Sequence, residues 1–136
     1  MNFIKAFLAA LVGSVVINAV LLFVFRSLVI NPDMPLHALS LPLVTVFTTI
    51  GAVGATIVYA IMRAFMSNPN KIFIWISVVV LVLSFIPDFL IIGQKTGPFA
   101  GGTVGTAILL MVMHVAAAAA IVYSLVKLWG AKVVTM

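Results

Sequence analysis

Long apolar runs separated by short polar segments dominate the hydrophobic pattern of this chain. Four of them lie at residues 6–25, 39–62, 72–92 and 104–128. A helix that crosses about 30 Å of hydrocarbon needs roughly 20 residues, and each run is about that long. Inside lipid the backbone N–H and C=O groups of a spanning segment must bond to one another, as they do in a helix. The pattern therefore predicts four transmembrane helices.

The segments between the runs are short and contain residues that end helices. NPDMP at 31–35 and SNPN at 67–70 contain prolines, which lack the backbone N–H and push the preceding residue out of the helical conformation. GQKTGPFAGG at 93–102 is a glycine-rich loop. None is long enough for a further domain. The predicted fold class is thus all-α, a four-helix transmembrane bundle that forms a single domain over residues 1–136.

The composition supports a membrane protein and excludes several other classes. Hydrophobic residues make up 65% of the chain and charged residues 7%, whereas a soluble domain is about half apolar and about a quarter charged. The seven Lys and Arg residues are scattered at the ends of the runs, so we expect the lipid bilayer as a partner and no nucleic acid. The absence of cysteine excludes thiolate metal sites and disulfide exchange, and the sequence indicates no cofactor.

The basic and aromatic residues predict the orientation. With four spans, both termini lie on one side of the membrane together with the 63–71 connection. Basic residues are more frequent on that side, with Lys5, Arg63, Lys71, Lys127 and Lys132 against Arg26 and Lys95 on the other. Because Lys and Arg favour cytoplasmic loops, both termini are predicted to be cytoplasmic. Aromatic residues toward the same side are expected to form an interfacial belt: Tyr59, Trp75, Tyr123 and Trp129.

Polar side chains within the runs gather toward the opposite, outer side. They are Asn18, Thr45, Thr48, Thr49, Ser84, Asp88 and His114. A carboxylate at the centre of a span costs about 2.5–3.5 kcal/mol, and less toward its edge. Asp88 should therefore face the bundle, take up a proton or find a partner. We predict that these seven residues line a polar cavity near the outer side.

His114 is the natural partner of Asp88, and Ser84 lies four residues before Asp88 on the same helix face. A rise of about 1.5 Å per residue leaves about 9 Å between Asp88 and His114 along the membrane normal. One bridging water, or a boundary that is wrong by one turn, closes this distance. Two other interpretations stay open: the Asp88 carboxylate can lie in outer water near the helix end, or it can belong to a polar core that orders the bundle. One histidine and one aspartate within the spans do not complete a metal site.

Small residues indicate where the helices touch. Helices in lipid associate by close packing where small side chains permit it. Gly51 and Ala55 have small-xxx-small spacing in the second run, and Gly101 and Gly105 have it at the start of the fourth. The fourth run also contains five alanines at 116–120. This pattern predicts that the second and fourth helices form the central pair.

Several stretches together resemble a known family. They are LPLVTVFTTIGAVGATIVYAIMR at 41–63, the Pro87–Asp88 pair, the glycine-rich loop, and MVMHVAAAAAIVY at 111–123. From about Leu41 onward the chain resembles a family of small bacterial four-helix integral membrane proteins of uncharacterised function. The resemblance implies the bacterial plasma (inner) membrane and the same four spans, and it implies no established activity.

Three functions remain as hypotheses. The first is a protein without enzymatic activity that acts as a homo-oligomer or as an accessory subunit of a membrane complex, because the loops are minimal and no catalytic set is present. The alternative is a small proton-linked transporter or permease that uses Asp88 and His114 in an outward-open polar cavity, since ionisable residues inside a membrane often mark transport pathways. The third is an intramembrane enzyme with His114 as acid or base, which no nucleophile partner or metal set in the sequence supports.

Overall fold

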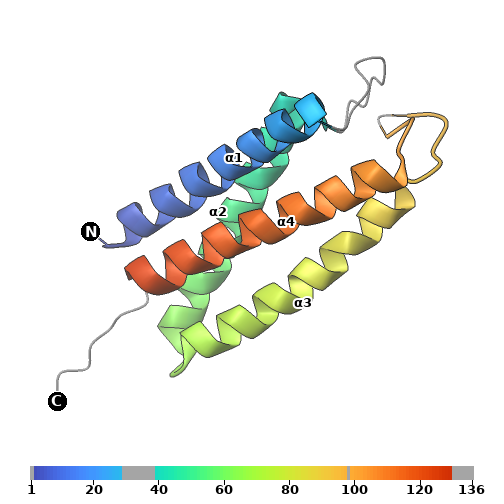
Figure 1. Ribbon diagram of the computed structural model, residues 1–136. Coiled ribbons are helices and arrows are strands. Elements are labelled where there is room, and N and C mark those ends of the chain that lie inside the picture. Colours follow the sequence, from blue (N-terminus) through green and yellow to red (C-terminus); the bar gives the residue numbers. More distant parts are fainter. Residues whose placement is uncertain (1, 29–38, 98, 130–136) are drawn as a thin grey trace.

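The computed structural model describes residues 2–28, 39–97 and 99–129 (Figure 1). Within these ranges the chain is all-helical, as predicted. The helices are α1 (Asn2–Leu28), α2 (Leu41–Phe65), α3 (Pro69–Leu90) and α4 (Val104–Ser124), and α4 continues into a π-helical turn, η2 (Leu125–Trp129). Each predicted run falls on one of these helices, and each helix is long and apolar enough to cross a membrane. Asp33, Lys132 and the predicted NPDMP turn lie outside the described residues.

Three of the helices begin where the sequence offers a local start signal. Pro42 lies in the first turn of α2, and Pro69 opens α3 after the Asn68 cap. Proline is favoured there because the first helical N–H groups have no partner inside the helix. Before α4, Thr103 and Thr106 form a reciprocal cap: each side-chain oxygen accepts a hydrogen bond from the backbone N–H of the other, at 3.3 and 2.8 Å.

The helices form two antiparallel hairpins, α1–α2 and α3–α4, which meet mainly where α4 packs against α1 (Figure 1). The rings of Phe3 and Trp129 lie 4.7 Å apart, so the start of α1 and the end of η2 share one end of the bundle. We call this the terminal end. The opposite end, where residues 91–103 connect α3 to α4, is the loop end.

The prediction that the second and fourth helices form the central pair is wrong. α4 packs on α1 and α3, and it barely contacts α2. The small residues that permit close packing belong to α1, where Ala6, Ala10 and Ser14 recur every fourth residue and are fully buried. Sequence reasoning overlooked this stripe because it contains no glycine.

Three of the four residues predicted for helix packing do not pack. Gly51 has open space around it, and exposed Gly105 faces only the Thr103 hydroxyl. Gly101 precedes α4 in the loop, where its φ of 86° explains the glycine. Ala55 does pack against buried residues at the terminal end. The GxxxG spacing of Gly101 and Gly105 therefore predicted a helix contact wrongly, because Gly101 belongs to a turn.

The core consists of two apolar clusters with polar residues between them along α1 and α2. The cluster at the terminal end contains Ala6, Ala10, Ala52, Tyr59, Met62, Phe73, Ile121 and Leu125. The cluster nearer the loop end contains Leu22, Leu39, Val44, Leu109 and Met113. Buried Ser14, Asn18 and Thr48 lie between the two in chain order.

The expected aromatic belt is only partly a surface feature. Trp75 and Tyr123 are exposed, whereas Tyr59 is fully buried and packs against the rings of Phe73 and Trp129 at 4.7 and 5.4 Å between centroids. Tyr59 is therefore a core residue, because it lies on the buried face that Thr56 and Met62 continue along α2.

Candidate functional site

Asp88 on α3 and His114 on α4 contact each other directly. Asp88 Oδ2 lies 3.0 Å from His114 Nδ1. The Asp88 side chain is 6% exposed, whereas that of His114 is 40% exposed. The carboxylate is thus enclosed by the protein, and the imidazole extends from it toward the surface. The interpretation of Asp88 as an interfacial residue with its carboxylate in outer water does not fit this burial.

The direction of side chains on antiparallel helices explains how the two meet. Each Cα–Cβ bond of a helix tilts toward the N-terminus of that helix. Asp88 therefore leans toward the terminal end along α3, and His114 leans toward the loop end along α4. The offset of about 9 Å expected from the sequence compared backbone levels alone and neglected this tilt.

The connection between the two helices is closely packed and fixes their register. Gly93 N–H donates to the Gly102 carbonyl at 3.0 Å, and Gly101 N–H donates to the Gln94 carbonyl at 2.9 Å. A Cβ on Gly102 would overlap the carbonyl oxygen of Ile91 at the end of α3. Glycine is needed there because two backbone segments touch. Sequence reasoning overlooked Gly102 because adjacent Gly101 offered the familiar spacing.

The Asp88–His114 contact is close but incompletely bonded. Although the two atoms are 3.0 Å apart, the geometry is not that of an in-line hydrogen bond, and neither atom has another hydrogen-bond partner among the described residues. A buried polar atom without a partner is costly in a low-dielectric interior. At this separation, and with no other partner in the described ranges, each atom is the nearest available partner of the other.

Asn18 and Thr48 form a second polar contact, between α1 and α2. Asn18 Nδ2 donates to Thr48 Oγ1 at 2.9 Å, and both residues are buried. The Asn18 Oδ1 atom is buried without a partner in the described part of the chain. Thr45, three residues before Thr48, and Thr49, the residue after it, are half-buried.

Four of the seven predicted polar residues thus meet, as two pairs, and no hydrogen bond joins the pairs within the described ranges. Ser84 is half-buried and donates to the carbonyl of Leu81 at 2.6 Å, so its hydroxyl serves its own helix. A single cavity lined by all seven stays a prediction. Among the described residues no group of three or more His, Cys, Asp or Glu side chains is positioned to bind a metal ion.

An arginine at the terminal end was missing from the predicted site. The guanidinium carbon of Arg63 lies 4.9 Å from the centre of the Trp129 ring and 6.0 Å from that of Tyr59. Tyr59 and Arg63 are four residues apart on one helix face, which was a usable signal. Trp129 comes from the far end of the described chain, so its part in the cluster could not be read from spacing.

Four apolar helices joined by short connections define the class of small multi-pass membrane proteins. Within that class, the chain belongs to a family of unknown function, DUF6069, whose model matches residues 2–128. This confirms the resemblance to membrane proteins of uncharacterised function. No curated protein and no solved structure matches the chain. Its function must therefore be argued from its own residues.

Proposed function

We propose that this protein is a small proton-linked transporter of a bacterial plasma membrane, in which Asp88 and His114 bind and release the proton. The observation that carries the proposal is the 3.0 Å separation between Asp88 Oδ2 and His114 Nδ1 within spanning helices. Asp88 is the only carboxylate, and His114 the only imidazole, in the described part of the chain. Ionisable side chains are rare inside membranes and commonly belong to proton and ion pathways.

The burial of the pair suits proton exchange. One proton moves the pair between a net charge of −1 and zero, and the cost of a net charge is large where the dielectric constant is low. In this proposal the half-exposed imidazole exchanges the proton with a water-accessible path. Among the described residues, Asp88 is the charged group that contacts His114.

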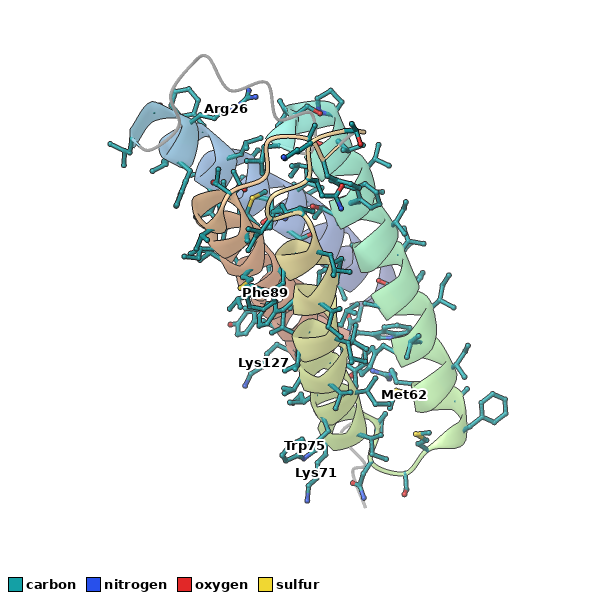
Figure 2. The ribbon with its side chains drawn as sticks, turned by 90° about the vertical axis from the view of Figure 1, so that its right-hand side faces the viewer. Arg26, Met62, Lys71, Trp75, Phe89 and Lys127 are labelled. Carbon is teal, nitrogen blue, oxygen red and sulfur yellow. The ribbon has the colours of Figure 1, made fainter. Side chains whose placement is uncertain are left out.

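Charge distribution supports an orientation with both termini in the cytoplasm. The described basic residues at the terminal end are Lys5, Arg63, Lys71 and Lys127, and those at the loop end are Arg26 and Lys95. Figure 2 shows Lys71 and Lys127 toward one end and Arg26 at the other. With this orientation, which follows the positive-inside rule, the Asp88–His114 pair would lie in the outer half of the membrane. In this proposal the protein has no enzymatic activity.

The experiment measures proton uptake into proteoliposomes that contain the purified protein and an internal pH-sensitive dye. The small-molecule fraction of a bacterial extract on both sides supplies any co-transported solute. An imposed inside-negative potential should drive proton uptake faster than in empty vesicles. Asp88→Asn keeps the shape of the side chain but cannot bind the proton, so it should reduce this uptake at least about tenfold, as should His114→Gln.

Ser84→Ala is the matched control, because Ser84 lies one turn from Asp88 and bonds only its own helix. It should transport at the wild-type rate. Uptake by wild-type protein that equals that of empty vesicles, or an undiminished rate in correctly folded Asp88→Asn, would overturn the proposal.

The first hypothesis, a homo-oligomer or an accessory subunit, is a second candidate supported by α3. Only Phe73 and Asp88 are buried along this helix, so most of its apolar surface is free to contact lipid or another protein. Mass measurement of the protein released from membranes in a mild detergent tests this role. An assembly of copies or a retained partner protein is expected, and a monomer without partner would contradict it.

A further inference from the structure

Arg63 at the terminal end has a charge that no described side chain balances. It lies in the last turn of α2, and the residue is half-buried. Its Nη1 atom is buried and has no hydrogen-bond partner in the described ranges. A guanidinium stays protonated at any physiological pH, so it cannot remove this cost by losing its charge. Arg63 therefore needs an acceptor from elsewhere.

The only described carboxylate is far away and already in contact. Asp88 contacts His114, and it follows Asn70 by eighteen residues of α3, which corresponds to about 27 Å along the helix. Asn70, which faces the Arg63 end of the bundle, accepts a hydrogen bond from the Tyr59 hydroxyl at 2.5 Å. Within the described residues no salt bridge involves Arg63.

The surroundings of Arg63 hold the guanidinium in place but leave Nη1 unpaired, although the Tyr59 hydroxyl oxygen is an acceptor close to the cation. The rings of Trp129 and Tyr59 flank the cation at 4.9 and 6.0 Å, and Trp129 in turn packs on Phe3. Aromatic faces attract a cation, but they do not pair with the N–H donors that point outward in the plane of the guanidinium. The π-helical turn η2 carries Trp129 to this position, and such turns occur frequently at functional sites.

Capping of the α2 helix is the simplest alternative role for Arg63. Basic residues near a helix C-terminus can bond its last carbonyl groups. No hydrogen bond from Arg63 to such a carbonyl is present among the described residues, and the Met66 N–H closes this end of the helix by donating to Met62 O at 2.8 Å. Helix capping therefore leaves the unpaired donor unexplained.

We propose that Arg63, flanked by Tyr59 and Trp129, binds the phosphate group of an anionic phospholipid at the terminal end of the bundle. The end of a spanning helix lies at the level of the lipid head groups, which is where Arg63 is found. The planar guanidinium binds two phosphate oxygens at once. Exposed Lys5, Lys71 and Lys127 at the same end attract the anionic leaflet. This site is independent of proton transport by Asp88 and His114.

The test is native mass spectrometry of the purified protein with a mixture of phosphatidylglycerol and phosphatidylcholine. Wild-type protein should retain phosphatidylglycerol in preference to phosphatidylcholine. Arg63→Gln should reduce that preference at least about fivefold. Arg63→Lys keeps the charge but loses the planar fork and should reduce it partially. Lys71→Gln removes the same charge from an exposed position at the same end and should have the smaller effect.

A second measurement uses Trp129 itself, in a Trp75→Phe background that leaves it as the only tryptophan. Brominated phosphatidylglycerol should quench its fluorescence more than brominated phosphatidylcholine, and Arg63→Lys should diminish the difference. This fluorescence measurement with Arg63→Lys tests the proposal even if Arg63→Gln does not fold. Equal lipid preference in wild type and folded Arg63 variants would overturn the proposal. Displacement of the lipid by millimolar inorganic phosphate would overturn it as well, by assigning the site to a soluble anion.

Discussion

The two buried polar contacts differ in what they can do, although each joins the helices of one hairpin. Asn18 and Thr48 join α1 to α2 through a neutral hydrogen bond of 2.9 Å between two buried residues. Asp88 and His114 join α3 to α4 at 3.0 Å, with an enclosed carboxylate and a half-exposed imidazole. The first contact has one chemical state. The second changes its charge when it takes up a proton.

This difference separates packing from function in a chain with few polar residues. Neutral hydrogen bonds between spanning helices contribute about 0.6 kcal/mol on average, so Asn18 and Thr48 suffice to align two helices. An ionisable pair is not needed for that purpose and costs more to bury. A purely structural role therefore accounts for the Asp88–His114 pair less well than for the Asn18–Thr48 pair.

The largest expected effect comes from Gly102, which holds the α3–α4 hairpin in register. Gly102→Ala places a methyl group against the Ile91 carbonyl and should destabilise the protein by about 2–3 kcal/mol. Gly51→Ala, in open space on α2, should stay within about 1 kcal/mol of wild type. Unfolding in mixed micelles measures both free energies.

Hydrogen exchange then shows where Gly102→Ala acts. Amide protons at the end of α3 should exchange faster, while those around Asn18 and Thr48 should keep their wild-type rates. Equal stability of the two alanine variants, or loss of protection spread evenly over both hairpins, would contradict a register fixed by the Gly102 contact.

The sequence predicted the helices well because lipid imposes a simple pattern of apolar length. It also named Asp88 and His114 as partners, since a buried carboxylate needs one. The helix neighbours were predicted wrongly. Packing depends on which face each helix presents, and the buried Ala6 and Ala10 of α1 look like ordinary apolar residues in the sequence. The Arg63–Trp129 contact joins distant residues, and no spacing rule anticipates it.

The second prediction concerns the energy that couples Asp88 to His114. His114→Leu leaves a buried carboxylate without its partner and should destabilise the protein by about 1–3 kcal/mol. The double variant with Asp88→Leu should be more stable than His114→Leu alone, because the unpaired carboxylate is gone. The unfolding free energies of wild type, the two single variants and the double variant should give a coupling energy of about 1–2 kcal/mol. Additive effects of the two substitutions would mean that the contact at 3.0 Å carries no net interaction.

The smallest effect is expected for the neutral contact in the other hairpin. Thr48→Val keeps the shape of the side chain and removes the hydroxyl that accepts a hydrogen bond from Asn18. A double-mutant cycle with Asn18→Leu should therefore give a coupling energy of about 0.6 kcal/mol. Thr49→Val is the control, since half-buried Thr49 has no contact with Asn18 among the described hydrogen bonds. Neither Thr48→Val nor Thr49→Val should alter proton uptake, because neither changes a group that titrates. A strong loss of uptake in Thr48→Val would instead connect both polar contacts to one pathway and remove the distinction between the hairpins.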